Sequence, residues 1–175
     1  RRLSMPLLLA AVRNPKSTPM ALSQTIVCLT KVNHPDALPA TLAALGILED
    51  AKGEGKAQEA GRRAFLNHPS LDNLYVILEK TAEDQPESLE AGWALAGLLE
   101  LVTRDSSAPE ARDHVRKFID QAWQDPIHKV GLINAAAQMR NHYLDARIRA
   151  ALNDFDEDVV KAAKTAVRRL RIPAL

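Results

Sequence analysis

Basic side chains near the C-terminus have the spacing best suited to binding chemistry. They fall at i, i+3, i+7 and i+10, which places them in one stripe along a helix: Lys161, Lys164, Arg168 and Arg171. Arg147 extends this set into the preceding segment. Such a stripe can neutralise the phosphates of a nucleic-acid backbone. The alternative is a solvated helix face whose cations collect at the negative end of the helix dipole.

Two other patterns resemble sites for phosphate or metal but lack required residues. Gly53-Glu54-Gly55-Lys56 resembles part of a phosphate-binding loop, yet Asp50 and Ala57 stand where that motif has glycine and serine or threonine. No His-Glu-x-x-His occurs, although three histidines at helix junctions could stack in adjacent repeats to bind a metal: His34, His68 and His142. We therefore assign no catalytic, cofactor-binding or metal-binding residue to this chain and predict no enzymatic activity for it.

Carboxylates gather around two predicted helix starts. The first cluster holds Glu83, Asp84, Glu87 and Glu90, and the second holds Asp154, Asp156, Glu157 and Asp158. An aspartate before a helix can accept hydrogen bonds from its first free amides, and acidic residues in the first turn favour its positive end. These structural roles account for both clusters without general acid–base catalysis.

Residues 144–170 contain the clearest pair of helices that would position the basic stripe. Ile148, Ala151 and Leu152 fall at i, i+3 and i+4, and a second apolar stripe runs from Val159 to Leu170. Two short helices with one apolar face each cannot bury those faces alone, so they need neighbours of the same kind. The sequence therefore predicts a helical repeat array.

The order of apolar helix, Asp-rich turn, Val159, basic residue, Ala162-Ala163 and closing Leu170 resembles a HEAT repeat. The resemblance implies an all-α fold, a right-handed α–α superhelix of the armadillo-like α-solenoid kind. It also implies that Asp154 or Asp156 caps the second helix and that Val159 packs inward. Val160 and Lys161 stand where the family usually has an arginine after the valine. The family uses such curved stacks for binding.

A repeated triplet supports this interpretation. Asn-His-Pro starts at residue 33 and again at residue 67, a period of 34 residues that is typical of helical solenoids. Helix breaks then define about five HEAT-like pairs, at roughly residues 3–33, 34–67, 69–104, 107–140 and 142–172. We predict one repeat domain over residues 1–175, and the ends of the sequence suggest a fragment of a longer chain.

Composition excludes several classes of protein. Hydrophobic residues make up 46% of the chain and aromatic residues only 4%, which suits close helix packing rather than strands. The net charge of +1 gives no global attraction to nucleic acid or anionic lipid. The single cysteine, Cys28, excludes an internal disulfide, and the apolar run Leu7–Val12 is too short to span a membrane. The compartment, cytoplasmic or periplasmic, stays open.

Three functions are compatible with these features. We predict a non-catalytic scaffold that binds a protein or peptide partner on a concave surface lined by the second helix of each pair. One alternative rests on the family resemblance: a structural spacer array in a larger bacterial extracytoplasmic protein with a c-type cytochrome module, whose other parts could be catalytic or redox-active. The other alternative is nucleic-acid backbone binding through the basic stripe. The oligomeric state stays open.

Overall fold

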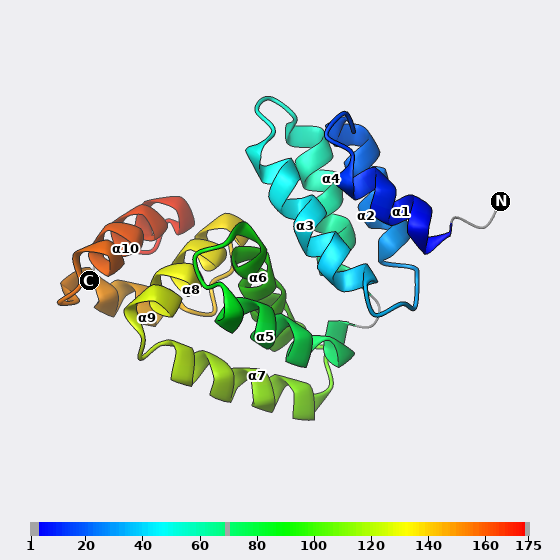
Figure 1. Cartoon of the computed structure of the whole chain (residues 1–175). Helices are drawn as coiled ribbons and strands as arrows, with labels where there is room; N and C mark the ends of the chain where they lie inside the picture. The colour runs from blue at the N-terminus through cyan, green and yellow to red at the C-terminus, as the bar shows by residue number, and fades with distance from the viewer. Residues whose placement is uncertain (1–3, 69–70, 174–175) are drawn as a thin grey trace. The chain divides into compact units, whose positions relative to one another are not determined.

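The computed structural model describes residues 4–68 and 71–173, which form ten α-helices and two short 3₁₀ turns without a strand in these ranges (Figure 1). The predicted all-α class is therefore confirmed. The chain divides into two compact units, residues 1–71 and 72–175. None of the helices in the described ranges has the length and apolar character needed to cross a membrane. The prediction of one repeat domain over residues 1–175 stays a prediction.

The first unit contains four helices: α1 (Met5–Arg13), α2 (Pro19–Leu29), α3 (Ala37–Asp50) and α4 (Gly55–Leu66). α2 lies at its centre and packs against each of the other three. Ile26 of α2 and Phe65 of α4 are fully buried in this core. Gly61 lets α4 approach closely, because a Cβ atom there would lie only 2.9 Å from Leu48 Cδ1 and 3.0 Å from Ile26 Cδ1.

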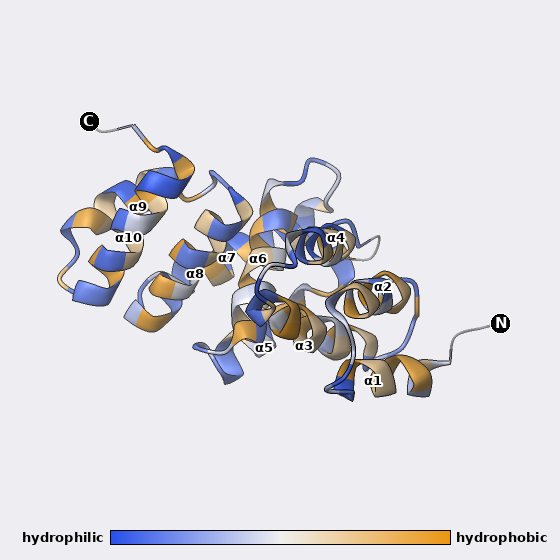
Figure 2. Ribbon diagram, turned by 90° about the horizontal axis from the view of Figure 1, so that it is seen from above, coloured by the Kyte–Doolittle hydropathy of each residue, from blue (hydrophilic) through white to orange (hydrophobic). Residues whose placement is uncertain are grey.

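The second unit contains six helices: α5 (Tyr75–Asp84), α6 (Leu89–Thr103), α7 (Pro109–Ala122), α8 (Pro126–Met139), α9 (Asp145–Ala150) and α10 (Glu157–Leu170). One 3₁₀ turn, η1 (Leu71–Asn73), spans the boundary of the units, and the other, η2 (Ala151–Asn153), follows α9. α6 packs on α8 and α8 packs on α10, which puts these three helices in one row. α5 packs on α6, and α9 packs on α10. Figure 2 shows polar and apolar residues alternating along α8 and α10.

The ten helices follow one another as five pairs, and we call the later member of each pair its second helix: α2, α4, α6, α8 and α10. Four of the second helices begin with a side chain that accepts a hydrogen bond from a free backbone amide. The acceptors belong to Thr18, Ser88, Asp125 and Asp156. Such caps fix where a helix starts. Asp156, which the sequence offered as one of two candidate caps, is the cap of α10.

Several apolar residues of the second unit do not face its core. Ile77 is 40% exposed and Leu89 is 44% exposed. α5 buries Leu78 and Ala82 instead, and Leu89 lies in the first turn of α6, directly after its cap Ser88. Leu152 is only half-buried, because the chain tightens into η2 there and the 3₁₀ geometry rotates it away from the α-helical stripe.

Pro86 comes two residues before Ser88, the cap of α6. Cys28 is half-buried. Pro69, which ends the second Asn-His-Pro triplet, lies outside the described residues.

Candidate binding surfaces on the second helices

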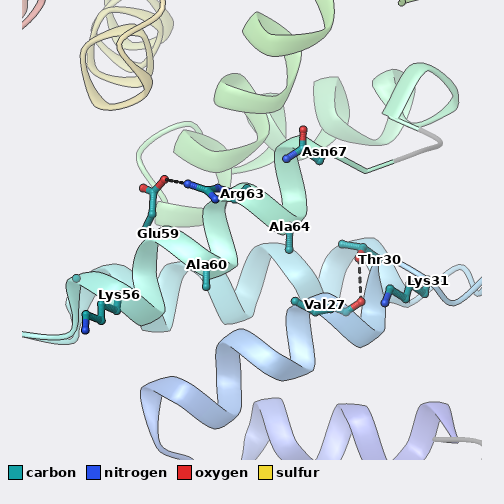
Figure 3. A pocket seen from close by; sticks show the side chains of 10 residues that line it. Val27, Thr30, Lys31, Lys56, Glu59, Ala60, Arg63, Ala64 and Asn67 are labelled. Atoms are coloured by element: carbon teal, nitrogen blue, oxygen red, sulfur yellow. Dashed lines mark hydrogen bonds and ion pairs between the residues drawn. The ribbon is translucent and has the colours of Figure 1, made fainter.

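An open groove of about 800 Å³ runs over α2 and α4 in the first unit (Figure 3). Both of its walls are second helices. We call it the α2/α4 groove and define it by its lining residues: Val27, Thr30, Lys31, Gly55, Lys56, Glu59, Ala60, Arg63, Ala64 and Asn67.

The floor of the α2/α4 groove is apolar, and its rim is cationic. Val27, Ala60 and Ala64 have small apolar side chains, and the Thr30 hydroxyl donates to the Val27 carbonyl at 3.0 Å. Three cations line the groove, and Figure 3 shows Lys56 toward one end and Lys31 toward the other, with Arg63 between them. Glu59 is the only carboxylate in the lining, 3.4 Å from Arg63. The groove can therefore bind a ligand that places an apolar group on the floor and a negatively charged group near the rim.

A second groove, of about 560 Å³, lies on the last helix, and we call it the α10 groove. It is lined by Asp154, Glu157, Val160, Lys161, Lys164, Thr165 and Arg168. Three of the predicted site residues, Lys161, Lys164 and Arg168, are thus brought together and are exposed. Arg168 Nε donates to the Lys164 carbonyl at 3.3 Å, and no carboxylate among the described residues forms an ion pair with these three cations. Their charge is available to a ligand.

The other two predicted site residues lie outside this lining. Arg171 ends α10 in the left-handed backbone region, with φ of 56°. Arg147 of α9 forms an ion pair with Asp120 of α7, and its guanidinium lies 5.7 Å from the centre of the Trp123 ring. The charge of Arg147 is therefore already used within the protein. Trp123 is half-buried beneath this cation.

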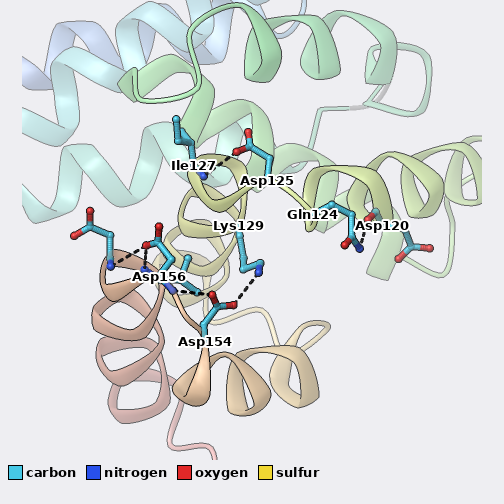
Figure 4. A network of polar contacts seen from close by, with 9 residues as sticks. Asp120, Gln124, Asp125, Ile127, Lys129, Asp154 and Asp156 are labelled. Carbon is cyan, nitrogen blue, oxygen red and sulfur yellow. Dashed lines mark hydrogen bonds and ion pairs between the residues drawn. The ribbon is translucent and has the colours of Figure 1, made fainter.

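A network of polar contacts fixes the turn between α9 and α10 (Figure 4). Lys129 Nζ of α8 donates to Asp154 Oδ2 at 2.8 Å, and Asp154 Oδ1 accepts from the Asp156 amide at 3.1 Å. Asp156 Oδ1 accepts from the amides of Asp158 at 2.9 Å and Val159 at 3.1 Å. The turn is thereby tied both to the neighbouring helix and to the helix that it starts.

The Lys129–Asp154 contact makes the stability of the second unit depend on pH. The hydrogen bond from Lys129, followed by the amide bond from Asp156, holds the pKa of Asp154 below its usual 3.8. A depressed carboxyl pKa means that the stabilisation is complete above 3.8 and disappears as the pH falls through the folded-state pKa.

We therefore expect Asp154→Asn to destabilise the second unit by a constant amount above about pH 5 and by progressively less below pH 3.8. Asparagine keeps an oxygen acceptor for the Asp156 amide but loses the charge that Lys129 binds. Urea unfolding of both proteins across this pH range measures the difference. A difference that does not change with pH would show that the charge contributes nothing.

Two acid–histidine contacts were not predicted from the sequence. Glu79 of α5 lies 3.1 Å from His114 Nε2 of α7, and burial raises the pKa of Glu79 although His114 partly opposes this. Asp125 contacts His128 three residues later, and this hydrogen bond lowers the pKa of Asp125. The first pair is separated by 35 residues, so no local spacing reveals it. Neither pair lines one of the two grooves.

Two of the three histidines at helix junctions, His34 and His142, are held by local contacts. His142 Nδ1 lies 2.8 Å from Asp145 Oδ2, and His34 Nδ1 accepts from the Asp36 amide at 3.1 Å. In residues 4–68 and 71–173, no group of three or more His, Cys, Asp and Glu side chains is arranged to hold a metal ion.

Both grooves are open surfaces on second helices and are lined by cations, which is an arrangement for binding a ligand by shape and charge. The hydroxyls in the two linings, those of Thr30 and Thr165, each donate a hydrogen bond to a backbone carbonyl of their own segment. The chain matches no protein-family model, no curated protein and no solved structure with which it was compared.

Proposed function

We propose that this chain is a non-catalytic protein-binding scaffold, built as an α-solenoid of HEAT-like helix pairs whose second helices carry the binding surface. The α2/α4 groove is the observation that supports this function most directly. It lies on two second helices, and its floor consists of small apolar side chains. Lys56 lies toward one end of the groove and Lys31 toward the other. In the second unit, α6, α8 and α10 pack in a row, which is the contact pattern of stacked repeats.

The chemistry of the groove favours a peptide segment over a small enclosed ligand. An open groove leaves one side of its ligand in solvent, whereas pockets for small molecules bury most of the ligand surface. Ala60 and Ala64 lie one helical turn apart, so a chain can approach α4 closely along this line. Lys31 and Lys56 then favour acidic residues in that chain, whereas the charge of Arg63 is paired with Glu59.

Selection from a displayed library of random peptides tests the proposal. We expect selected peptides to bind the wild-type chain and to lose binding to Ala60→Trp, because the exposed Ala60 allows an indole to fill the groove without entering the core. Ala10→Trp, at an exposed alanine of α1, is the matched control and should bind as well as wild type. No enrichment, or binding that Ala60→Trp leaves unchanged, would contradict the proposal and favour the inert spacer array.

The α10 groove supports a second candidate function, binding to a nucleic-acid backbone. Lys161, Lys164 and Arg168 are exposed along it and their charges are free of ion pairs with described carboxylates. Contacts of this kind bind phosphates without reading sequence, and they weaken as salt rises.

Fluorescence anisotropy with labelled duplex DNA at low salt tests this candidate. We expect the double substitution Lys161→Glu with Arg168→Glu to weaken binding at least about tenfold, because two phosphate contacts become repulsive. A matched double substitution, Lys80→Glu with Lys117→Glu, reverses the same charge at exposed sites outside the groove and should have less effect. Equal affinity for the wild type and the first variant would exclude this function.

A further inference from the structure

Phe155 is the most exposed large apolar side chain among the described residues, with a relative exposure of 107%. It comes directly before Asp156, the cap of α10. An apolar residue at that position often packs on the fourth residue of the helix, here Val160, and thereby stabilises the helix start. A fully exposed Phe155 makes no such contact. Its position therefore serves no packing role within its own unit.

The turn that carries Phe155 is held in one conformation. Residues 154–158 form what we call the acidic turn. Asp154 is bound by Lys129, and the side chains of Asp154 and Asp156 accept hydrogen bonds from two backbone amides within the turn and from the amide of Val159 directly after it. Little conformational freedom is thus lost when Phe155 enters a binding site, and rigid aromatic side chains are effective anchors at interfaces for this reason.

The acidic turn also defines the kind of surface that would receive it. Phe155 is flanked by four carboxylates, those of Asp154, Asp156, Glu157 and Asp158, of which only Asp154 has a cationic partner in an ion pair among the described residues. The receiving surface must have an apolar depression that is large enough for one aromatic ring, with cationic side chains around it. A phosphate backbone or an acidic peptide would be repelled.

The α2/α4 groove has these properties. Its floor of Val27, Ala60 and Ala64 is apolar, its volume of about 800 Å³ exceeds that of one aromatic side chain, and Lys31, Lys56 and Arg63 line it. We propose that the acidic turn of one copy of this chain docks in the α2/α4 groove of a second copy, with Phe155 as the anchor. This inference rests on the proposed function, since it names an occupant of the same groove.

Because the two surfaces differ, the contact is heterologous, and further copies can add to the free turn and the free groove. One aromatic anchor with a few exposed charge pairs gives weak, reversible association. Sedimentation velocity should therefore show the weight-average mass rising between about 10 µM and about 1 mM protein. Added salt should lower that mass, because it screens the exposed charges.

Matched variants test both sides of the contact. Phe155→Ala should lower the association constant by about tenfold or more, the amount expected for one buried aromatic ring. Tyr143→Ala removes an aromatic side chain that is 37% exposed outside the turn and should leave association unchanged. On the groove side, Ala60→Trp should abolish association, and Lys56→Glu, which cannot disturb the core, should weaken it. Circular dichroism verifies that each variant is folded.

Two results would overturn the inference: a wild-type chain that stays monomeric up to about 1 mM, or association that neither Phe155→Ala nor the groove variants reduce. If the wild type stays monomeric while selected peptides still bind the groove, only the self-association is wrong and the scaffold function stands. If no peptide binds and the chain does associate through Phe155, the groove binds only the acidic turn of another copy of this chain.

Discussion

Phe65→Ala should lower the free energy of unfolding of the first unit by about 3–5 kcal/mol. Phe65 has a relative exposure of 0% and is the largest fully buried side chain in that unit. Its removal costs the transfer energy of the ring and leaves a cavity between α4 and its neighbours, which the close approach of α4 at Gly61 prevents from closing. Urea unfolding followed by circular dichroism measures this change.

Phe155→Ala is the matched control, because the same atoms are removed from a fully exposed position. At protein concentrations low enough to keep the chain monomeric, its free energy of unfolding should stay within about 0.5 kcal/mol of the wild type. Similar losses for the two variants would mean that burial does not distinguish these phenylalanines.

Ile148→Ala should destabilise the second unit by about 2–5 kcal/mol. Ile148 of α9 is fully buried, and α9 packs on α10. Truncation at this position therefore weakens the contact that holds the last pair together. Trp93 and Trp123 both lie in the second unit, so urea unfolding followed by tryptophan fluorescence reports on it directly.

Leu152→Ala provides the comparison for Ile148→Ala. The sequence pattern places both side chains on one buried face, but Leu152 in η2 is only half-buried. We expect its truncation to cost less than that of Ile148, because fewer apolar contacts and a smaller cavity are involved. A larger loss of unfolding free energy for Leu152→Ala than for Ile148→Ala would contradict the half-buried position of Leu152 and favour the buried position that its α-helical spacing predicts.

Features that depend on neighbouring residues could be predicted from the sequence. The start of α10 follows from Asp156, whose side chain reaches amides two and three residues later, and its buried face follows from the spacing of Val159 through Leu170. α7 likewise begins at Pro109, where proline fits the first turn. Hydrogen bonds and helical periodicity that involve residues close in sequence can be predicted from the sequence itself.

Features that depend on packing between helices could not be predicted in the same way. Which residues of α5 face inward is decided by α6, and the exposure of Ile77 follows from that contact. The pairs Lys129–Asp154 and Glu79–His114 join residues 25 and 35 positions apart. Each of these side chains, read alone, is an ordinary surface residue.

The candidate site was predicted in part. The spacing of Lys161, Lys164 and Arg168 gave the lining of the α10 groove, but the ion pair of Arg147 with Asp120 depends on how α9 meets α7. The α2/α4 groove was missed altogether. Its one local signal is Ala60 and Ala64 at i and i+4 among cations, and alanines in a helix more often mark packing than an open surface.

The row of α6, α8 and α10 also has a consequence for how fast the second unit folds. α6 packs on α8 and α8 packs on α10, so each contact of the row joins two consecutive pairs of the chain. Little loop-closure entropy is lost before such contacts form, and helical proteins of low relative contact order fold within microseconds to milliseconds. The second unit can therefore acquire its core pair by pair as the chain emerges, before an unpaired apolar face meets another molecule.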